Sequence, residues 1–235
     1  MIGIGVVGYG YWGPQIVRNF HSLNDARVAL VCDKRPEALK RAKQAFPDVE
    51  VTTDICQVLM SSAVDAVAVV TPVWTHFELA KAALENSKHV FVEKPFTSTS
   101  QQAQQLIELG AKKNLRIMVD HTFLFTGAVK KIRQLIDDDE LGKLYYYDST
   151  RVNLGLFQHD VNVIWDLAPH DLSIILYLFG ETPISVNCQG QAHICEGIED
   201  ITNMSLTFDN GRMATIQSSW LDPNKVREMT IVGSK

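Results

Sequence analysis

The sequence predicts two domains of different class. The first is an α/β domain with a parallel, doubly wound sheet, and the second is an α+β domain with a mainly antiparallel sheet. Over the first half of the chain, short β-branched runs alternate with longer helical patterns. These runs are apolar throughout, as in strands covered on both faces. After about residue 121 strand patterns follow one another directly, so we expect domains at residues 1–121 and 122–235.

Each element of the first domain has its own signal. Helix starts are marked by Pro36 and by the Thr/Ser cluster at 97–100. The expected strands are 2–7, 28–32, 64–70, 89–92 and 116–119, and the expected helices are 14–20, 36–46, 75–86 and 98–113.

The second domain begins with a predicted helix at 127–137 and an aromatic strand at 143–153. A greasy helix follows at 164–180. The turn "DNG" then joins two of three further strands as a hairpin; the three strands are 184–194, 200–208 and 211–219. The chain stops inside another strand-like run, "REMTIVGSK", so we expect a domain shortened at its C-terminus.

Composition excludes several classes of protein. Of the 235 residues 46% are hydrophobic and 21% are charged, which suits a globular core. The net charge of −5 is spread without blocks, which argues against nucleic-acid binding. No apolar run is long enough for a membrane span, and the N-terminus lacks the pattern of a signal peptide. The four cysteines show no metal-ligand spacing, and Cys32 and Cys56 lie among apolar residues, so we expect these two to be buried thiols in a reducing cytoplasm.

The loop "GYGYWG" is the first motif with a chemical meaning. Gly8, Gly10 and Gly13 follow an apolar strand and open a helix, and an acidic residue closes the next strand about 20 residues later. This context predicts a dinucleotide site, with the pyrophosphate at the helix N-terminus and Tyr11 and Trp12 among the cofactor contacts. The alternative is a glycine-rich turn that binds no nucleotide.

The acidic residue, Asp33, is expected to accept hydrogen bonds from the adenosine ribose and to repel a 2′-phosphate. It therefore favours NAD over NADP. Lys34, which we also expect to contact the cofactor, and Arg35 weaken this preference because cations there could hold a phosphate.

Two more strand ends carry polar residues, and ligands of open parallel sheets bind at the carboxyl ends of strands. At the first, Thr71, Pro72 and His76 are expected to contact the cofactor; the alternative for His76 is a solvent-facing position after a cap at Thr75. At the second, "EKP", Glu93 is expected at the cofactor. Lys94 could stabilise negative charge on a substrate oxygen, and the alternative is an exposed pair on a loop.

The greasy helix carries Asp166 four residues before His170, which places both on one face. A carboxylate there would fix the imidazole tautomer and raise its basicity. Pro169 suggests that the pair lies near the helix start. The alternatives are a structural hydrogen bond and a metal site with His159 and Asp160; we expect no metal.

With these motifs assembled, the chain resembles the glucose–fructose oxidoreductase/inositol dehydrogenase family (Gfo/Idh/MocA). The resemblance rests on "GYGYWG", "DKRPE", "TPVWTH", "EKP" and "DLAPH". It implies an N-terminal Rossmann domain, a sheet-based C-terminal domain, and hydride transfer between NAD(P) and a ring carbinol of a sugar, inositol or nucleotide sugar. It also implies that Lys94, Asp166 and His170 are catalytic. "WDLAPHDL" is similar to members with nucleotide-sugar 3-dehydrogenase and ketoreductase chemistry.

Four residues are expected to line the substrate pocket: His121, Arg151, Asn153 and Trp165. Arg151 could hold a substrate phosphate or carboxylate through its planar fork, and its alternative role is a cross-strand ion pair. Trp165 could form one wall of the nicotinamide pocket, or it could only pack against neighbouring side chains.

The strands at 200–219 need cover on their outer face, which predicts a homodimer or homotetramer. Two functions other than a dehydrogenase are also considered for this sequence: a non-catalytic NAD-binding sensor on the same fold, and a metal-dependent hydrolase.

Overall fold

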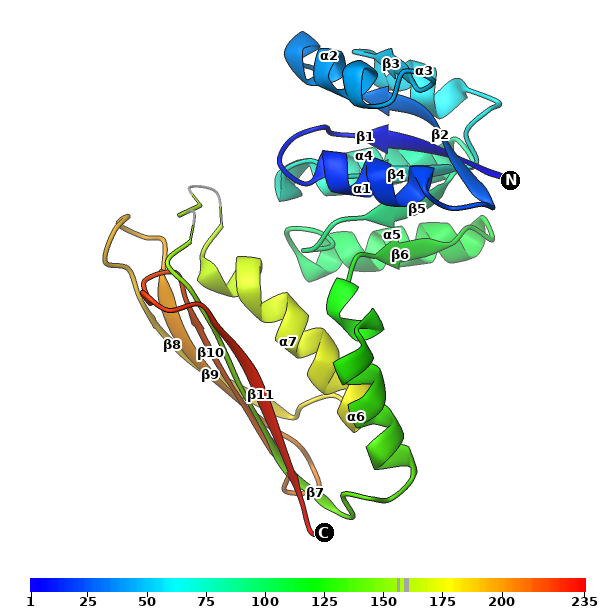
Figure 1. Cartoon of the computed structure of the whole chain (residues 1–235). Helices are drawn as coiled ribbons and strands as arrows, with labels where there is room; N and C mark the ends of the chain where they lie inside the picture. Colours follow the sequence, from blue (N-terminus) through cyan, green and yellow to red (C-terminus); the bar gives the residue numbers. More distant parts are fainter. Residues whose placement is uncertain (156, 159–160) are drawn as a thin grey trace. The chain divides into compact units, whose positions relative to one another are not determined.

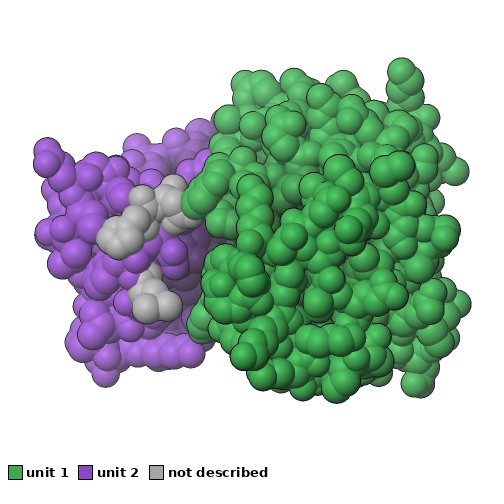
Figure 2. Space-filling view, turned by 90° about the horizontal axis from the view of Figure 1, so that it is seen from above, with its two compact units in different colours: residues 1–120 green, residues 121–235 purple. Residues whose placement is uncertain are grey.

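The structure, a computed structural model, describes residues 1–155, 157–158 and 161–235. The chain divides into two compact units, Met1–Asp120 and His121–Lys235, which are coloured separately in Figure 2. Among the described residues, no helix has the length and apolar character needed to cross a membrane.

The first unit is a six-stranded sheet in the order β3-β2-β1-β4-β5-β6 (Figure 1). Every strand pair in it is parallel, which confirms the predicted class. The chain leaves β1 in one direction toward β2 and returns to its other side with β4, so the crevice for ligands lies between these strand ends. The strands are β1 (Ile2–Val7), β2 (Ala26–Cys32), β3 (Glu50–Thr52), β4 (Ala66–Val69), β5 (His89–Val92) and β6 (Ile117–Val119).

Helices cover both faces of this sheet. Val6 packs with residues of α1 and α2, whereas Val7 packs with residues of α3, α4 and α5. Neighbouring residues of one strand thus point into two cores, which explains why the strand sequences are apolar throughout. The helices are α1 (Gly13–His21), α2 (Pro36–Ala45), α3 (Ile55–Met60), η1 (Val73–Thr75), α4 (His76–Glu85) and α5 (Ser100–Lys112).

Neither β3 nor α3 was expected from the sequence. β3 is a three-residue edge strand that pairs with β2 alone, so it needs no long apolar run. α3 is short and begins at Asp54, whose side chain accepts a hydrogen bond from the backbone N–H of Cys56 at 2.9 Å.

The second unit is a five-stranded sheet in the order β11-β7-β10-β9-β8, with α6 and α7 on one face (Figure 1). Only β7 and β10 pair in parallel, so the sheet is mainly antiparallel as predicted. The predicted hairpin joins β9 to β10, where Gly211 adopts a φ of +79°. The elements are η2 (Thr122–Phe125), α6 (Gly127–Asp137), β7 (Leu144–Val152), α7 (Val163–Phe179), β8 (Ser185–Gln191), β9 (Ile201–Thr207), β10 (Met213–Ser219) and β11 (Val226–Gly233).

Helix α7 has nearly the bounds that the sequence suggested. Its N-cap is Asn162, whose side chain accepts from the backbone N–H of Trp165, and its C-cap is Gly180 in the left-handed conformation. Pro169 lies inside the helix, beyond its first turn, and not near the helix start as expected. Because proline has no N–H, the carbonyl of Trp165 loses its helical donor at that point.

Candidate active site

The glycine-rich loop between β1 and α1 has room for a ligand at one glycine only. A Cβ on Gly8 would lie 2.3 Å from the Val70 carbonyl oxygen, and one on Gly13 would lie 2.5 Å from that of Gly8. Both glycines are therefore required by packing. A Cβ on Gly10 would meet only Arg35 Nη2, at 3.7 Å. Packing does not explain this glycine, whereas close approach of a pyrophosphate does, so the loop fits a dinucleotide.

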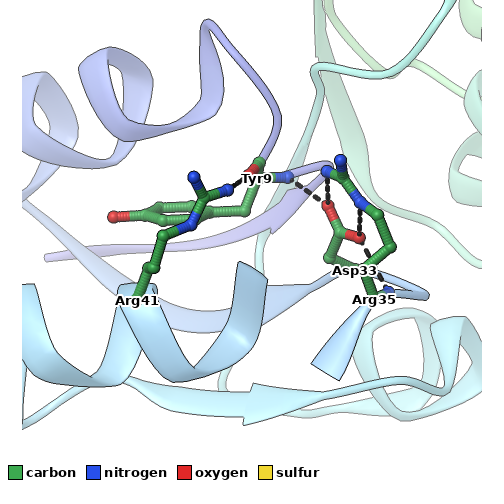
Figure 3. A network of polar contacts seen from close by, with 4 residues as sticks. All are labelled: Tyr9, Asp33, Arg35 and Arg41. Carbon is green, nitrogen blue, oxygen red and sulfur yellow. Dashed lines mark hydrogen bonds and ion pairs between the residues drawn. The ribbon is translucent and has the colours of Figure 1, made fainter. Parts of the chain in front are cut away.

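The Asp33 carboxylate has hydrogen-bond partners within the protein that were not expected (Figure 3). It is buried after β2, and its Oδ2 accepts from the backbone N–H of Tyr9 at 2.7 Å and from Arg35 Nη2 at 2.9 Å. Its Oδ1 accepts from the backbone N–H and the Nε of Arg35, at 2.9 and 3.0 Å. These bonds fill the roughly four acceptor positions of a carboxylate, and the hydrogen bonds to Arg35 hold its pKa below the usual range although burial raises it.

A ribose can therefore bind Asp33 only after the Arg35 guanidinium moves away. That side chain is 52% exposed, so it can leave without disturbing the core. Arg41 Nη2 donates to the carbonyl oxygen of Tyr9 at 3.3 Å, which places a second guanidinium at the same loop (Figure 3). The guanidinium groups of Arg35 and Arg41 thus offset the negative charge of Asp33 more than the sequence suggested.

The other loop residues expected at the cofactor lie at the surface. Tyr11 is 83% exposed and its ring stacks on that of Trp12, with ring centroids 6.2 Å apart. Lys34 is also exposed. These side chains are accessible to a ligand.

His76 has a structural position that the sequence did not predict. It is 1% exposed, so the solvent-facing alternative is wrong. Its Nδ1 lies 2.9 Å from the carbonyl oxygen of Pro95, and its Nε2 lies 2.7 Å from that of Thr71. Burial lowers the pKa of this imidazole. Both ring nitrogens face backbone, so His76 links the loop after β4, which includes Pro72, to the loop that carries Lys94.

Glu93 and Asp120 follow neighbouring parallel strands, β5 and β6, and their carboxyl groups are hydrogen-bonded to each other. Burial and the Asp120 charge raise the pKa of Glu93 to about 8. Its Oε1 is buried and has no hydrogen-bond partner in the part of the chain that the structure describes. This oxygen is available to a donor from a bound cofactor, next to the half-buried Lys94.

Asp166 and His170 lie one turn apart on α7, and both are half-buried. Asp166 Oδ2 accepts a hydrogen bond from Trp220 Nε1 at 3.0 Å, and Trp220 is itself buried. The His170 ring meets the Phe123 ring edge-on, with centroids 4.7 Å apart. The pair is thus anchored to two elements outside α7, on a helix that an apolar core holds in place.

Arg151 is not placed as a substrate ligand in this structure. Its side chain is 5% exposed, and its Nε and Nη2 donate to Asp171 Oδ2 and Oδ1 at 2.6 and 3.2 Å. The pair joins β7 to α7. Arg151 therefore forms an ion pair, as the alternative role supposed, but its partner lies on a helix and not on a neighbouring strand. The hydroxyl of Tyr147 lies 3.4 Å from Asp171 Oδ1, and burial raises the pKa of that tyrosine.

The remaining candidates are spread over the second unit. His121 precedes η2 and is half-buried; Asn153 follows β7, and its backbone N–H donates to the Ser219 carbonyl oxygen at 3.1 Å. Trp165 is 42% exposed in the first turn of α7. His159 and Asp160, on which the metal alternative depends, lie outside the described residues.

A glycine loop without a packing role at Gly10, polar strand ends and an Asp–His helix define a class, the dinucleotide-binding oxidoreductases with an appended sheet domain. Residues 2–121 match the family described as "Oxidoreductase family, NAD-binding Rossmann fold", and residues 129–235 match the GFO/IDH/MocA C-terminal domain. The chain therefore belongs to the GFO/IDH/MocA oxidoreductase family. This confirms the resemblance, the fold class and the NAD-binding assignment.

Relatives show the range of reactions in this family. The chain is 29% identical to a UDP-N-acetylglucosamine 3-dehydrogenase of Acidithiobacillus ferrooxidans, over 97% of this chain and 70% of that protein. It is 27% identical to the scyllo-inositol 2-dehydrogenase (NADP(+)) of Bacillus subtilis, over 92% of this chain and 62% of that protein. A solved UDP-N-acetylglucosamine 3-dehydrogenase of A. ferrooxidans superposes with a TM-score of 0.88 at 28% identity, covering 100% of this chain and 75% of that one.

Proposed function

We propose that this chain is an NAD-dependent dehydrogenase that transfers a hydride between nicotinamide and a ring carbinol of a sugar, cyclitol or nucleotide sugar. The observation that carries the proposal is the Asp166–His170 pair, one helical turn apart and anchored by the bond from Trp220 to Asp166. The family match supplies the cofactor class. The named relatives act on a nucleotide sugar and an inositol, which supports the substrate class.

The bound cofactor would supply the hydride acceptor, and the protein residues would handle the proton. We infer that His170 takes the hydroxyl proton as general base. Asp166 orients its ring and favours the protonated form. Lys94 donates a hydrogen bond to the same substrate oxygen and stabilises the partial negative charge as the proton leaves. In the reverse direction His170 acts as the acid. Gly10, Glu93 and the first turn of α1 would hold the cofactor.

Steady-state kinetics of His170→Ala tests this assignment. We expect turnover to fall by roughly 10²–10⁴ while NADH binding, followed by nicotinamide fluorescence, is nearly unchanged. His21→Ala is the control, because His21 lies at the end of α1 and has an aspartate, Asp48, 3.9 Å from its ring. Near-normal turnover of His170→Ala would remove His170 from the reaction.

A non-catalytic NAD-binding sensor is the second candidate. The match to an NAD-binding Rossmann family supports cofactor binding in either case, and the chain spans 62% to 70% of the length of the two curated relatives named above. The two proposals differ in one result: a sensor binds NADH but reduces no NAD with any carbinol. The presence of Lys94, Asp166 and His170 supports the dehydrogenase.

Two further assignments belong to this proposal. We propose a cytoplasmic location, which the thiols of Cys32, Cys56 and Cys188 support, since none of the three is in a disulfide. We also propose a homodimer or homotetramer through the face of the second sheet that is turned away from α7. Exposed Asn203, Thr207 and Met213 lie on it. Sedimentation showing a monomer at micromolar concentration would contradict this.

A further inference from the structure

Two arginines lie side by side on the helix-facing side of the second sheet. Arg227 of β11 is the register partner of Arg151 of β7, and directly opposed residues of an antiparallel pair point to the same face. Arg151 reaches α7 through Asp171, so this face is the one that α7 covers. The residues that follow Arg227 at alternate positions, Met229 and Ile231, pack in the core beneath α7 and confirm the direction.

The two arginines differ in what they contact. Arg151 is buried and forms the bidentate pair with Asp171. Arg227 is exposed, and among the described residues it makes no hydrogen bond or ion pair. A planar guanidinium that the protein itself does not engage can bind an oxyanion through two parallel hydrogen bonds.

The surroundings of Arg227 leave hydrogen-bond donors without acceptors. Nη1 of Arg151 is buried without a hydrogen-bond partner among the residues described, and so is the hydroxyl of Ser218. Ser218 is the register partner of Arg151 on its other side, so Arg227, Arg151 and Ser218 form one row across β11, β7 and β10. Partial burial and the Arg151 charge lower the pKa of the otherwise exposed Arg227, although Asp166 and Asp171 oppose this shift.

The row also lies close to the residues assigned to catalysis. Asp171, which holds Arg151, follows His170 directly, and the Phe123 ring that meets His170 edge-on lies 4.4 Å from the Arg151 guanidinium carbon. The negative charge of Asp166 also acts on Arg227, because it raises the pKa of that guanidinium. A substrate held at Arg227 would therefore lie on the same side of the sheet as the Asp166–His170 pair.

We propose that Arg227 binds an oxyanion carried by the sugar substrate, a phosphate or a carboxylate, so that the enzyme prefers anionic sugars to neutral cyclitols. The proposal rests on the proposed dehydrogenase function and narrows its substrate class. Arg151, one of whose two expected roles was to hold such an oxyanion, acts as the buried support beside it.

Calorimetric binding and kinetics of Arg227→Met and Arg227→Lys test this proposal with three compounds. UDP-N-acetylglucosamine carries a diphosphate, glucuronate carries a carboxylate, and scyllo-inositol is neutral. We expect Arg227→Met to weaken binding of the preferred anionic compound about 10- to 100-fold and to leave scyllo-inositol unchanged. Arg227→Lys should fall between Arg227→Met and the wild type. Lys143→Met, which removes an exposed cation at the other end of β7, should match the wild type.

The loss with UDP-N-acetylglucosamine or with glucuronate tells which oxyanion is bound. An Arg227→Met variant that binds both anions as the wild type does, or a wild type that binds only scyllo-inositol, overturns the inference. If Arg227-dependent anion binding is found but no compound reduces NAD, the inference stands and the proposed dehydrogenase function fails.

Discussion

Replacing Asp171 with asparagine should strongly destabilise the second unit. The Arg151 and Asp171 side chains are 5% and 2% exposed, and Asp171 accepts both of the guanidinium hydrogen bonds that hold Arg151 to α7. Asp171→Asn keeps the side-chain shape but leaves the Arg151 charge buried without a counter-ion. Breaking a buried pair in this way costs about 3–5 kcal/mol. That is a large part of the roughly 5–15 kcal/mol that stabilises a typical domain.

Urea unfolding followed by tryptophan fluorescence measures this effect, because Trp165 and Trp220 both lie in the second unit. Asp137→Asn is the matched control. Asp137 pairs with Arg133 on the surface of α6, and such solvent-exposed pairs contribute little to stability.

The double variant Arg151→Met/Asp171→Leu keeps the test valid if Asp171→Asn does not fold. Replacing both members of a buried pair by apolar residues is often neutral, so the double variant should recover most of the lost free energy of unfolding. If Asp171→Asn loses no more than the Asp137→Asn control, the pair is not a buried structural element, and Arg151 returns as a candidate substrate ligand.

Two further predictions concern the first unit. Arg35→Met should free the Asp33 carboxylate for the ribose and remove a cation that could hold a 2′-phosphate, raising the preference for NADH over NADPH about tenfold. Fluorescence titration with both cofactors measures this, with Lys40→Met as the control; an unchanged ratio would show that Arg35 does not compete. For Glu93, the folded chain keeps a proton up to pH about 8, whereas the unfolded chain releases it near its ordinary pKa of about 4.3. Stability should therefore fall as pH rises between these values, and Glu93→Gln should remove that fall in urea midpoints measured across the range; the same slope in both proteins would contradict it.

Local patterns were sufficient for much of the fold. The apolar runs predicted the strands of the parallel sheet because both faces of that sheet are covered, as the two environments of Val6 and Val7 show. β3 and α3 were missed because an edge strand of three residues and a short helix carry little periodicity. Pro169 was placed too near the helix start because interior proline is disfavoured in helices, yet it lies beyond the first turn of α7.

The site was less predictable, because side-chain pairing depends on neighbours distant in the sequence. Spacing placed Asp166 and His170 on one face, but it could not show that Trp220 anchors the aspartate. Arg151 was a reasonable candidate for a substrate ligand from the sequence, but the structure shows its guanidinium paired with Asp171. Arg227 gave no signal, since its position beside Arg151 follows from the β7–β11 register alone.

The central claim is that hydrogen moves from a ring carbon of the substrate to the cofactor. The most direct measurement is mass spectrometry of the cofactor after the protein has been incubated with NAD and ring-deuterated UDP-N-acetylglucosamine. The account predicts reduced nicotinamide that carries one deuterium, formed far more slowly by His170→Ala than by the wild type. Reduced cofactor without deuterium would contradict the account. So would the absence of reduced cofactor with this sugar and with the equally labelled glucuronate and scyllo-inositol.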